Sequence, residues 1–302
     1  MAGKQEGRVT SAQLRALGIG ESTFRRWKDW YLYPVLPRVW AVGHPGRSER
    51  ADLFSAVLYA GPGAALAGLT GGLWRGLVKW RTAPAIEVAT PRRCRSLPAD
   101  HPDNRLGIPI AVHGGREFRR WSYHGIPTTP VPQIVLDLAA TGDLELVRFV
   151  LAQLDFMRIL DEPALLGRCR QGVPGGALLR EALGRPQPLL ARARSPFEVR
   201  LVIVCEITGM RLPDALNVKI AGHTVDAVWW DEQVVVECDG EANHGTWRQR
   251  RRDVGEEMKL RGLKFLPIRY TTDKLDDPWA IYADLGAELE ARRGRGGLAL
   301  AG

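Results

Sequence analysis

The sequence is poor in cysteine and in long apolar runs. Its 302 residues include four isolated cysteines and no CxxC pair, which argues against a disulfide framework and a zinc knuckle. No apolar stretch approaches the roughly 20 residues that a membrane-spanning helix needs, and the first ten residues lack the apolar segment of a secretory signal. We therefore expect a cytoplasmic protein with buried free thiols at Cys94, Cys169, Cys205 and Cys238.

Lysine is also scarce. Of the 42 basic residues, 35 are arginine and 7 are lysine, a usage typical of GC-rich prokaryotic genomes. Nothing in the composition indicates a disordered or fibrous chain, because 45% of the residues are hydrophobic, 25% are charged and 8% are aromatic. A chain of this length favours two domains, with room for a connecting module.

Positive charge is concentrated in the first part of the chain. Residues 1–193 carry 26 basic and 16 acidic residues, a net charge of +10, whereas residues 194–302 carry 16 and 18, a net charge of −2. A basic region fits a polyanionic partner such as DNA. Charge that serves only solubility explains the same numbers equally well.

The N-terminal pattern predicts a winged helix-turn-helix. Thr10 and Gln13 form a capping box that starts a helix ending near Gly18, and a second helix is expected over residues 21–30. Residues 32–43 suit a small hairpin, the position of a wing. The second helix would enter the major groove, so the candidates for DNA contact are Ser22, Thr23, Arg25, Arg26 and Lys28, with Arg38 on the wing. A plain helical hairpin is the alternative.

The middle of the chain predicts a mixed α+β module over residues 81–183. After a helical region at 50–80, strands are expected over 85–90, 108–113 and 118–123, and helices over 131–140, 144–156 and 162–169. The stretch 184–194 has two prolines and no clean periodicity, which predicts a linker.

The C-terminal part predicts an α/β sheet. A helix begins at Ser195, has Pro196 at its first position and Glu198 at its third, and ends at Gly209. Strands are expected over 216–222, 223–230, 233–240 and 263–270, with a helix over 247–261 between the last two. Because these strands are apolar on both faces, we expect helices to cover the sheet on both sides.

Acidic residues converge on two of these strands. A loop centred on residues 231–232 pairs Trp229 with Val234 and places Asp226 opposite Glu237, with Asp239 on the same face. Like charges placed opposite each other destabilise a sheet, and a divalent cation such as Mg²⁺ would offset that repulsion. The alternatives are a carboxylate pair in solvent, a pair bonded to arginine, or a register shifted by one residue.

Groups suited to phosphodiester chemistry follow the acidic strand. His244 would assist proton transfer or hold the scissile phosphate. Four arginines would bind neighbouring phosphates, although they also fit a solvated helix face: Arg248, Arg250, Arg251 and Arg252.

From about Ser195 to Thr272 the sequence resembles the PD-(D/E)XK nucleases, in particular the branch of the very-short-patch-repair endonucleases. The resemblance lies in the motifs SPFE, VDAVW, VECDG with GEANH, and RRD followed by LRGLKFL. It implies that Asp226 and Glu237 bind Mg²⁺ or Mn²⁺, that Asp239 replaces the usual lysine, and that His244 is catalytic. Glu198 matches the first-helix acid of this family and equally matches a capping-box residue.

Residues of about 7–140 resemble the winged-helix region of AbiEi-type antitoxins, which are DNA-binding autoregulators. The resemblance lies in VTSAQLRALGIGESTFRRW, PVLPRVWAV and GIPTTPVPQIVLDLA.

Together these patterns predict a multidomain α/β and α+β protein. The expected parts are a winged-helix DNA-binding region (1–80), the mixed middle module (81–183), the linker (184–194) and a restriction-endonuclease-like domain (195–290). The first functional hypothesis is a metal-dependent DNA endonuclease. The second is a non-enzymatic DNA-binding regulator or antitoxin, with a toxin as partner and a relic nuclease domain, because fold alone does not establish activity.

Overall fold

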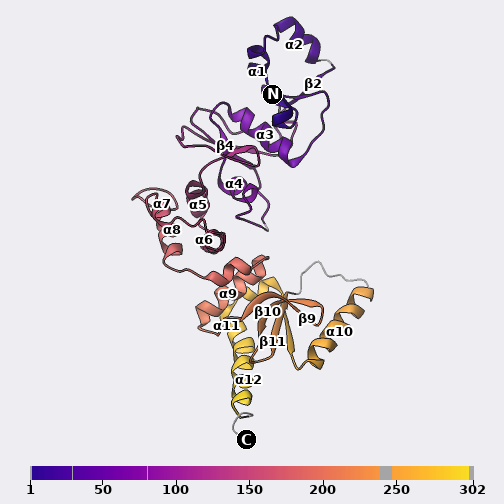
Figure 1. Cartoon of the computed structure of the whole chain (residues 1–302), viewed down its shortest axis with the longest axis vertical. Coiled ribbons are helices and arrows are strands. Elements are labelled where there is room, and N and C mark those ends of the chain that lie inside the picture. Colours follow the sequence, from indigo (N-terminus) through magenta and orange to yellow (C-terminus); the bar gives the residue numbers. More distant parts are fainter. Residues whose placement is uncertain (1, 29, 80, 239–246, 299–302) are drawn as a thin grey trace. The chain divides into compact units, whose positions relative to one another are not determined.

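Two structural units divide the chain. The computed structural model describes residues 2–28, 30–79, 81–238 and 247–298 (Figure 1), and of residues 247–254 and 294–298 it describes only the backbone. Unit 1 comprises Met1–Leu144 with Asp161–Glu181, and unit 2 comprises Glu145–Leu160 with Ala182–Gly302. The described residues form three β-sheets flanked by helices, so the predicted mixed α/β and α+β class is confirmed. None of the described helices is long and apolar enough to cross a bilayer.

Unit 1 begins with a small sheet and two short helices. A turn of helix (η1, Ala2–Gln5) precedes β1 (Arg8–Thr10), α1 (Ser11–Ala16), α2 (Glu21–Lys28), β2 (Leu32–Leu36) and β3 (Val39–Val42). The strands pair in the order β1-β3-β2. The predicted capping box is present, because the Gln13 backbone N–H donates to Thr10 Oγ1 (3.1 Å) and the Thr10 N–H donates to Gln13 Oε1 (2.9 Å). The predicted hairpin is confirmed as β2 and β3.

A second, five-stranded sheet completes unit 1. Its strands lie in the order β6-β5-β4-β8-β7 and are β4 (Ala65–Leu66), β5 (Ile86–Thr90), β6 (Ile110–Gly114), β7 (Trp121–Tyr123) and β8 (Ile126–Thr128). The helices of this part are α3 (Glu49–Ala60), α4 (Gly68–Trp74), α5 (Val131–Ala139), α7 (Glu162–Leu166) and α8 (Gly176–Leu183). The sequence predicted β5, β6 and β7 but missed β4 and β8, since two or three residues are too few to show an alternating pattern.

The two sheets of unit 1 share one hydrophobic core. Helix α3 is buried over most of its length and contacts strands of both sheets. Phe54 of α3 belongs to a cluster that contains Val39 of β3 and also Val88 of β5 and Ile110 of β6. The predicted boundary at residue 80 therefore does not separate two cores, because one hydrophobic core contains residues from both sides of it.

Unit 2 begins with helix α6 (Leu144–Phe156), which groups with the C-terminal part of the chain. Arg148 of α6 is nearly buried and binds Glu206 through two hydrogen bonds of 2.7 and 2.8 Å. Residues 184–194, predicted as a linker, include the short 3₁₀ helix η2 (Pro188–Arg192), in which Leu190 and Ala191 are buried. This segment is part of the folded unit.

A four-stranded sheet forms the centre of unit 2. Helix α9 (Pro196–Thr208) precedes the antiparallel strands β9 (Ala215–Ile220), β10 (His223–Trp229) and β11 (Val234–Cys238). Helix α10 (Trp247–Gly262) then leads to β12 (Leu266–Tyr270), which pairs with β11 in parallel. The chain ends in η3 (Thr272–Asp276), α11 (Pro278–Ile281), η4 (Tyr282–Gly286) and α12 (Ala287–Leu298).

Both faces of this sheet are covered, as predicted. Residues 227–229 of β10 and 234–236 of β11 are all fully buried. Because consecutive residues of a strand point to opposite faces, such runs require protein on both sides. Leu260 of α10 packs with Val228 and Val235 on one face, and Figure 1 draws α9 and α11 on the other side of β10 and β11.

Candidate functional site

The hairpin of β10 and β11 has the predicted register. Trp229 pairs with Val234, and Ala227 pairs with Val236. The next pair in this register is Asp226 with Glu237, which places two acidic residues opposite each other where the described part of the ladder ends. The hairpin prediction that centred the loop on residues 231–232 is thus confirmed.

Glu198 lies at the first turn of α9 and is 2% exposed. Its carboxylate accepts hydrogen bonds from the Ser195 hydroxyl (2.7 Å) and from the Arg194 backbone N–H (2.7 Å). The side-chain amide of Asn217 also donates to it. Ser195 in turn accepts from the Glu198 N–H at 3.3 Å and so caps α9, whereas the Glu198 carboxylate accepts the backbone N–H of Arg194 where a capping box would use that of Ser195.

Asn217 was not predicted as a site residue. It has a φ of +55° inside β9, a left-handed conformation that asparagine tolerates better than most residues. Its amide donates both to Glu198 and to the Arg192 carbonyl oxygen (3.2 Å). An asparagine within a β-branched strand pattern is the sequence signal that could have singled it out.

Asp226 lies in the electrostatic field of two other carboxylates. Burial raises its pKa from the ordinary 3.8 to about 6, and the negative charges of Glu198 and Glu237 add to this rise. A hydrogen bond from the Cys238 backbone N–H to Asp226 Oδ2 (2.6 Å) acts in the opposite direction and lowers the pKa. A half-buried carboxyl group with a pKa this far above normal is a feature of functional sites and of structural charge clusters alike.

Glu237 has two side-chain partners that the sequence analysis missed, a histidine and an arginine. His223 Nε2 lies 2.6 Å from Glu237 Oε1, and Arg269 Nε lies 3.3 Å from Glu237 Oε2. His223 Nδ1 also lies 3.0 Å from Glu256 Oε2 on α10. Arg269 is the direct cross-strand neighbour of Glu237. This position depends on the register of the parallel strands β11 and β12, which a long connection joins, so the register cannot be counted from a turn.

The donor set is suited to a hard divalent cation. Asp226 and Glu237 offer the carboxylate oxygens that Mg²⁺ prefers, and the negative charges of Glu198 and Glu237 both raise the pKa of Asp226. Within the described residues, no group of three or more histidine, cysteine or acidic side chains is arranged to hold a metal ion. Asp239 and His244, both predicted as site residues, lie outside the described residues.

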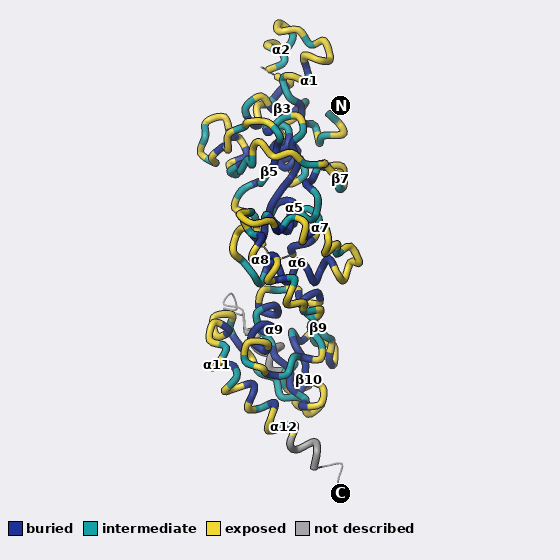
Figure 2. The backbone as a smooth tube through the Cα atoms, turned by 90° about the vertical axis from the view of Figure 1, so that its left-hand side faces the viewer, coloured by how far each residue is buried: buried dark blue, intermediate teal, exposed yellow. Residues whose placement is uncertain are grey.

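The predicted DNA-contacting residues of unit 1 lie on one short helix and one turn. Helix α2 has no buried residue (Figure 2), and Ser22, Arg25 and Arg26 are exposed while Thr23 is half-buried. Arg38 is exposed in the turn between β2 and β3, where its φ is +67°.

Two of the basic residues on α2 have neighbours of their own. Arg25 pairs with Glu21 at 3.6 Å on the surface, and the ammonium group of Lys28 lies 5.1 Å from the centroid of the Trp40 ring. The predicted phosphate-binding arginines of unit 2 are on α10, where the side chains lie outside the described part of the structure: Arg248, Arg250, Arg251 and Arg252.

Comparisons with known proteins give no family. No family model matches the sequence, and no curated protein matches it. Among solved structures, the chain is similar to the crystal structure of the RV2827C protein from Mycobacterium tuberculosis, with 16% sequence identity and a TM-score of 0.36. That match covers 62% of this chain and 75% of the other chain.

Proposed function

We propose that this protein is a metal-dependent DNA endonuclease in which unit 2 hydrolyses phosphodiester bonds. The observation that carries the proposal is the strand register that sets Asp226 opposite Glu237, with the pKa of Asp226 raised to about 6 by burial and by the negative charges of Glu198 and Glu237. The order of helix, three antiparallel strands, helix and parallel strand also supports it. This order agrees with the resemblance of residues 195–272 to the PD-(D/E)XK nucleases.

In this proposal Asp226 and Glu237 hold Mg²⁺ or Mn²⁺. The ion, when bound, would polarise the scissile phosphate and lower the pKa of the attacking water. Glu198 holds the Asn217 amide and the start of α9 in place beside Asp226. Asp239 and His244 remain the proposed source of the third carboxylate and of the proton-transfer group.

His223 and Arg269 bind the carboxylate of Glu237 when no cation is bound. A divalent ion would take over that role, since its charge is larger than that of either partner. The two side chains would then be free to contact the phosphate of a bound strand, as cationic donors do in phosphoryl-transfer sites.

Unit 1 supplies DNA binding in this proposal. The region 1–193 has a net charge of +10, and α2 presents its polar face to solvent. The proposed contacts are Ser22, Thr23, Arg25, Arg26 and Lys28 in the major groove, Arg38 on the β2–β3 turn, and Arg248, Arg251 and Arg252 on phosphates of the cleaved region.

Plasmid cleavage tests the activity. Purified protein is incubated with supercoiled plasmid and Mg²⁺ or Mn²⁺, beside an EDTA control and the double variant Asp226→Ala, Glu237→Ala. We expect nicking or linearisation by the wild type and none by the double variant. Glu257→Gln is the matched control, because Glu257 pairs only at the surface with Arg261 (2.9 Å) and its loss removes one acidic group without touching the cluster.

One observation favours a second candidate function, a non-enzymatic DNA-binding regulator or antitoxin with a toxin as partner. Glu237 already has both carboxylate oxygens engaged by His223 and Arg269, which is how a purely structural carboxylate is stabilised. In that case the protein binds DNA with the same salt sensitivity, and no metal or substrate gives cleavage above the level of the double variant.

A further inference from the structure

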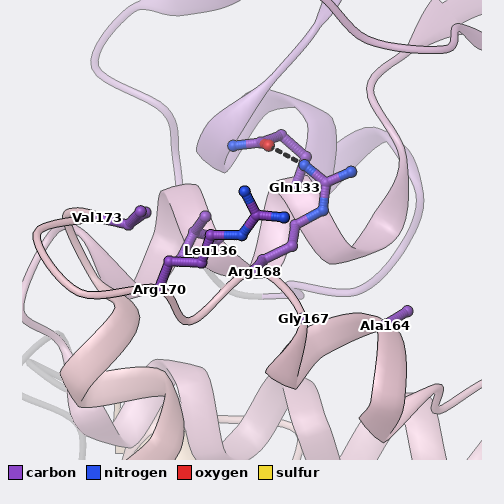
Figure 3. A pocket seen from close by; sticks show the side chains of 7 residues that line it. All are labelled: Gln133, Leu136, Ala164, Gly167, Arg168, Arg170 and Val173. Atoms are coloured by element: carbon purple, nitrogen blue, oxygen red, sulfur yellow. Dashed lines mark hydrogen bonds between the residues drawn. The ribbon is translucent and has the colours of Figure 1, made fainter.

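A basic pocket lies in unit 1. Its volume is about 520 Å³, and it lies between α5 and the segment that follows α7 (Figure 3). Gln133 and Leu136 contribute from α5, while Arg168, Arg170 and Val173 contribute from the later segment. Clefts of this volume are typical of sites for small molecules.

The positive charge of this pocket is not balanced by a carboxylate. A guanidinium N–H of Arg168 donates to the side-chain oxygen of Gln133, which is a neutral partner. In the described part of the chain, neither Arg168 nor Arg170 forms an ion pair with an acidic side chain. Arg180 nearby also bonds to a neutral acceptor, the Cys169 carbonyl oxygen at 2.8 Å.

Asp137, the acidic residue connected to this network, already has a cation of its own. Its Oδ1 accepts from Arg116 Nη1 at 2.8 Å and from Gln133 Nε2 at 2.9 Å. Asp137 forms its ion pair with Arg116, and the hydrogen-bond partner of Arg168 is the neutral Gln133. Gln133 instead links the two, donating to Asp137 and accepting from Arg168, and this fixes the Arg168 side chain.

The pocket combines two guanidinium groups with apolar walls. In Figure 3 the side chains of Arg168 and Arg170 extend into the same space beside Leu136. Arg168 is half-buried and Arg170 is exposed, so one charge is fixed and the other is free to adjust. A planar guanidinium group can donate two parallel N–H hydrogen bonds to the oxygens of one phosphate. Leu136 and Val173 offer apolar contacts to the organic part of a ligand.

We propose that this pocket binds a phosphate ester, with the phosphate between Arg168 and Arg170 and the organic part against Leu136 and Val173. The phosphate belongs either to a free nucleotide-sized molecule or to the 5′ end of a DNA strand, and the chemistry is the same for both. The site is in unit 1 and does not depend on the acidic cluster of unit 2.

Binding measurements on the full-length protein test this site. Inorganic phosphate and deoxyadenosine 5′-monophosphate are titrated by calorimetry at low ionic strength, and a 5′-phosphorylated DNA duplex is compared with the same duplex lacking that phosphate. The variants are Arg168→Gln, Arg170→Gln and the double variant. Arg105→Gln is the matched control, because Arg105 is an exposed arginine of the same unit and the bond given for it is made by its backbone N–H, to the Val35 carbonyl oxygen.

We expect each single variant to weaken phosphate-ester binding about 10-fold, the loss typical of one charge-assisted contact, and the double variant to abolish it. Arg168→Lys keeps the charge but loses the paired geometry, so we expect an intermediate loss. Thermal unfolding monitors folding of each variant.

If the arginine variants lose binding of the mononucleotide, the ligand is a free phosphate ester. If they lose binding only of the 5′-phosphorylated duplex, the ligand is the end of a DNA strand. Two results would overturn the proposal: no saturable binding of any of these ligands by the wild type, or equal binding by the wild type, the double variant and Arg105→Gln.

Discussion

Asp226 is an acidic residue of unit 2 whose surroundings raise its pKa. It is half-buried, lies close to Glu198 and Glu237, and keeps a hydrogen bond from the Cys238 N–H at 2.6 Å. Its folded pKa of about 6 lies above the ordinary value of 3.8. The folded protein therefore holds this proton more tightly than the unfolded chain, and the resulting stabilisation is complete below about pH 3.8 and is lost as the pH rises through about 6.

Asp226→Asn tests this linkage. In EDTA, we expect the variant to gain stability relative to the wild type as the pH rises from 4 to 7.5, by up to about 3 kcal/mol. The reason is that asparagine has no charged form for burial and the neighbouring carboxylates to destabilise. Urea unfolding at several pH values measures the difference. Asp276→Asn, at an exposed surface pair with Arg200, is the control, and a wild-type-like pH dependence in Asp226→Asn would contradict the assignment.

At the scale of elements, the ion pair of Arg148 and Glu206 joins α6 to α9. Arg148 is nearly buried, binds Glu206 through both terminal nitrogens, and donates its Nε–H to the Arg185 carbonyl oxygen at 3.0 Å. The pair explains why α6, predicted in the middle module, packs with the C-terminal part of the chain. The arginine at the centre of an apolar helix pattern was the available signal, but the sequence did not identify its partner 58 residues away.

Arg148→Ala is expected to destabilise unit 2 by about 3 kcal/mol, because it removes the cation and leaves Glu206 without its main partner. Replacing both residues by methionine should cost less than the single change. Urea unfolding followed by tryptophan fluorescence gives the free energies. Arg200→Ala breaks an exposed pair with Asp276 and should cost less than about 1 kcal/mol; equal costs for the two alanine variants would refute the role of Arg148.

At the scale of the whole molecule, the shared core of unit 1 sets what folds independently. Phe54 and its neighbours on α3 pack with Val39 of the first sheet and with Val88 and Ile110 of the second. A fragment of residues 1–80 would expose the side of α3 that the second sheet covers. We expect this fragment to show no cooperative thermal unfolding and a poorly dispersed amide NMR spectrum, in contrast to the full chain.

The proposed DNA binding is also tested at this scale, because its salt dependence would reflect how many basic side chains of the protein contact phosphates. If Arg25 and Arg26 contact phosphates, the double variant Arg25→Gln, Arg26→Gln should reduce the slope of log K against log salt concentration by about 2, since each lost contact contributes about 0.9. Fluorescence anisotropy with a labelled duplex at several salt concentrations measures the slope. Arg105→Gln should leave it unchanged, and an unchanged slope in the double variant would remove α2 from the interface.

Local order in this protein follows from sequence alone. The capping box at Thr10, the N-cap at Ser195, the left-handed Gly209 that ends α9 (φ +71°) and the register of the β10–β11 hairpin all depend on residues a few positions apart. Turn geometry and side-chain periodicity act over such distances, so the pairing of Trp229 with Val234 and the meeting of Asp226 with Glu237 could be counted directly.

Tertiary structure decided the contacts between distant segments. Three residues contact the acidic residues in this way. His223 lies at the start of β10, Arg269 lies beside Glu237 in the parallel pair of β11 and β12, and Asn217 is a left-handed residue within β9. The single core around α3, the place of α6 in unit 2 and the pocket between Gln133 and Arg170 arise in the same way. Such contacts depend on how whole helices and strands pack. Packing is a sum over many weak, non-directional interactions, and a short stretch of sequence does not predict which distant segments they bring together.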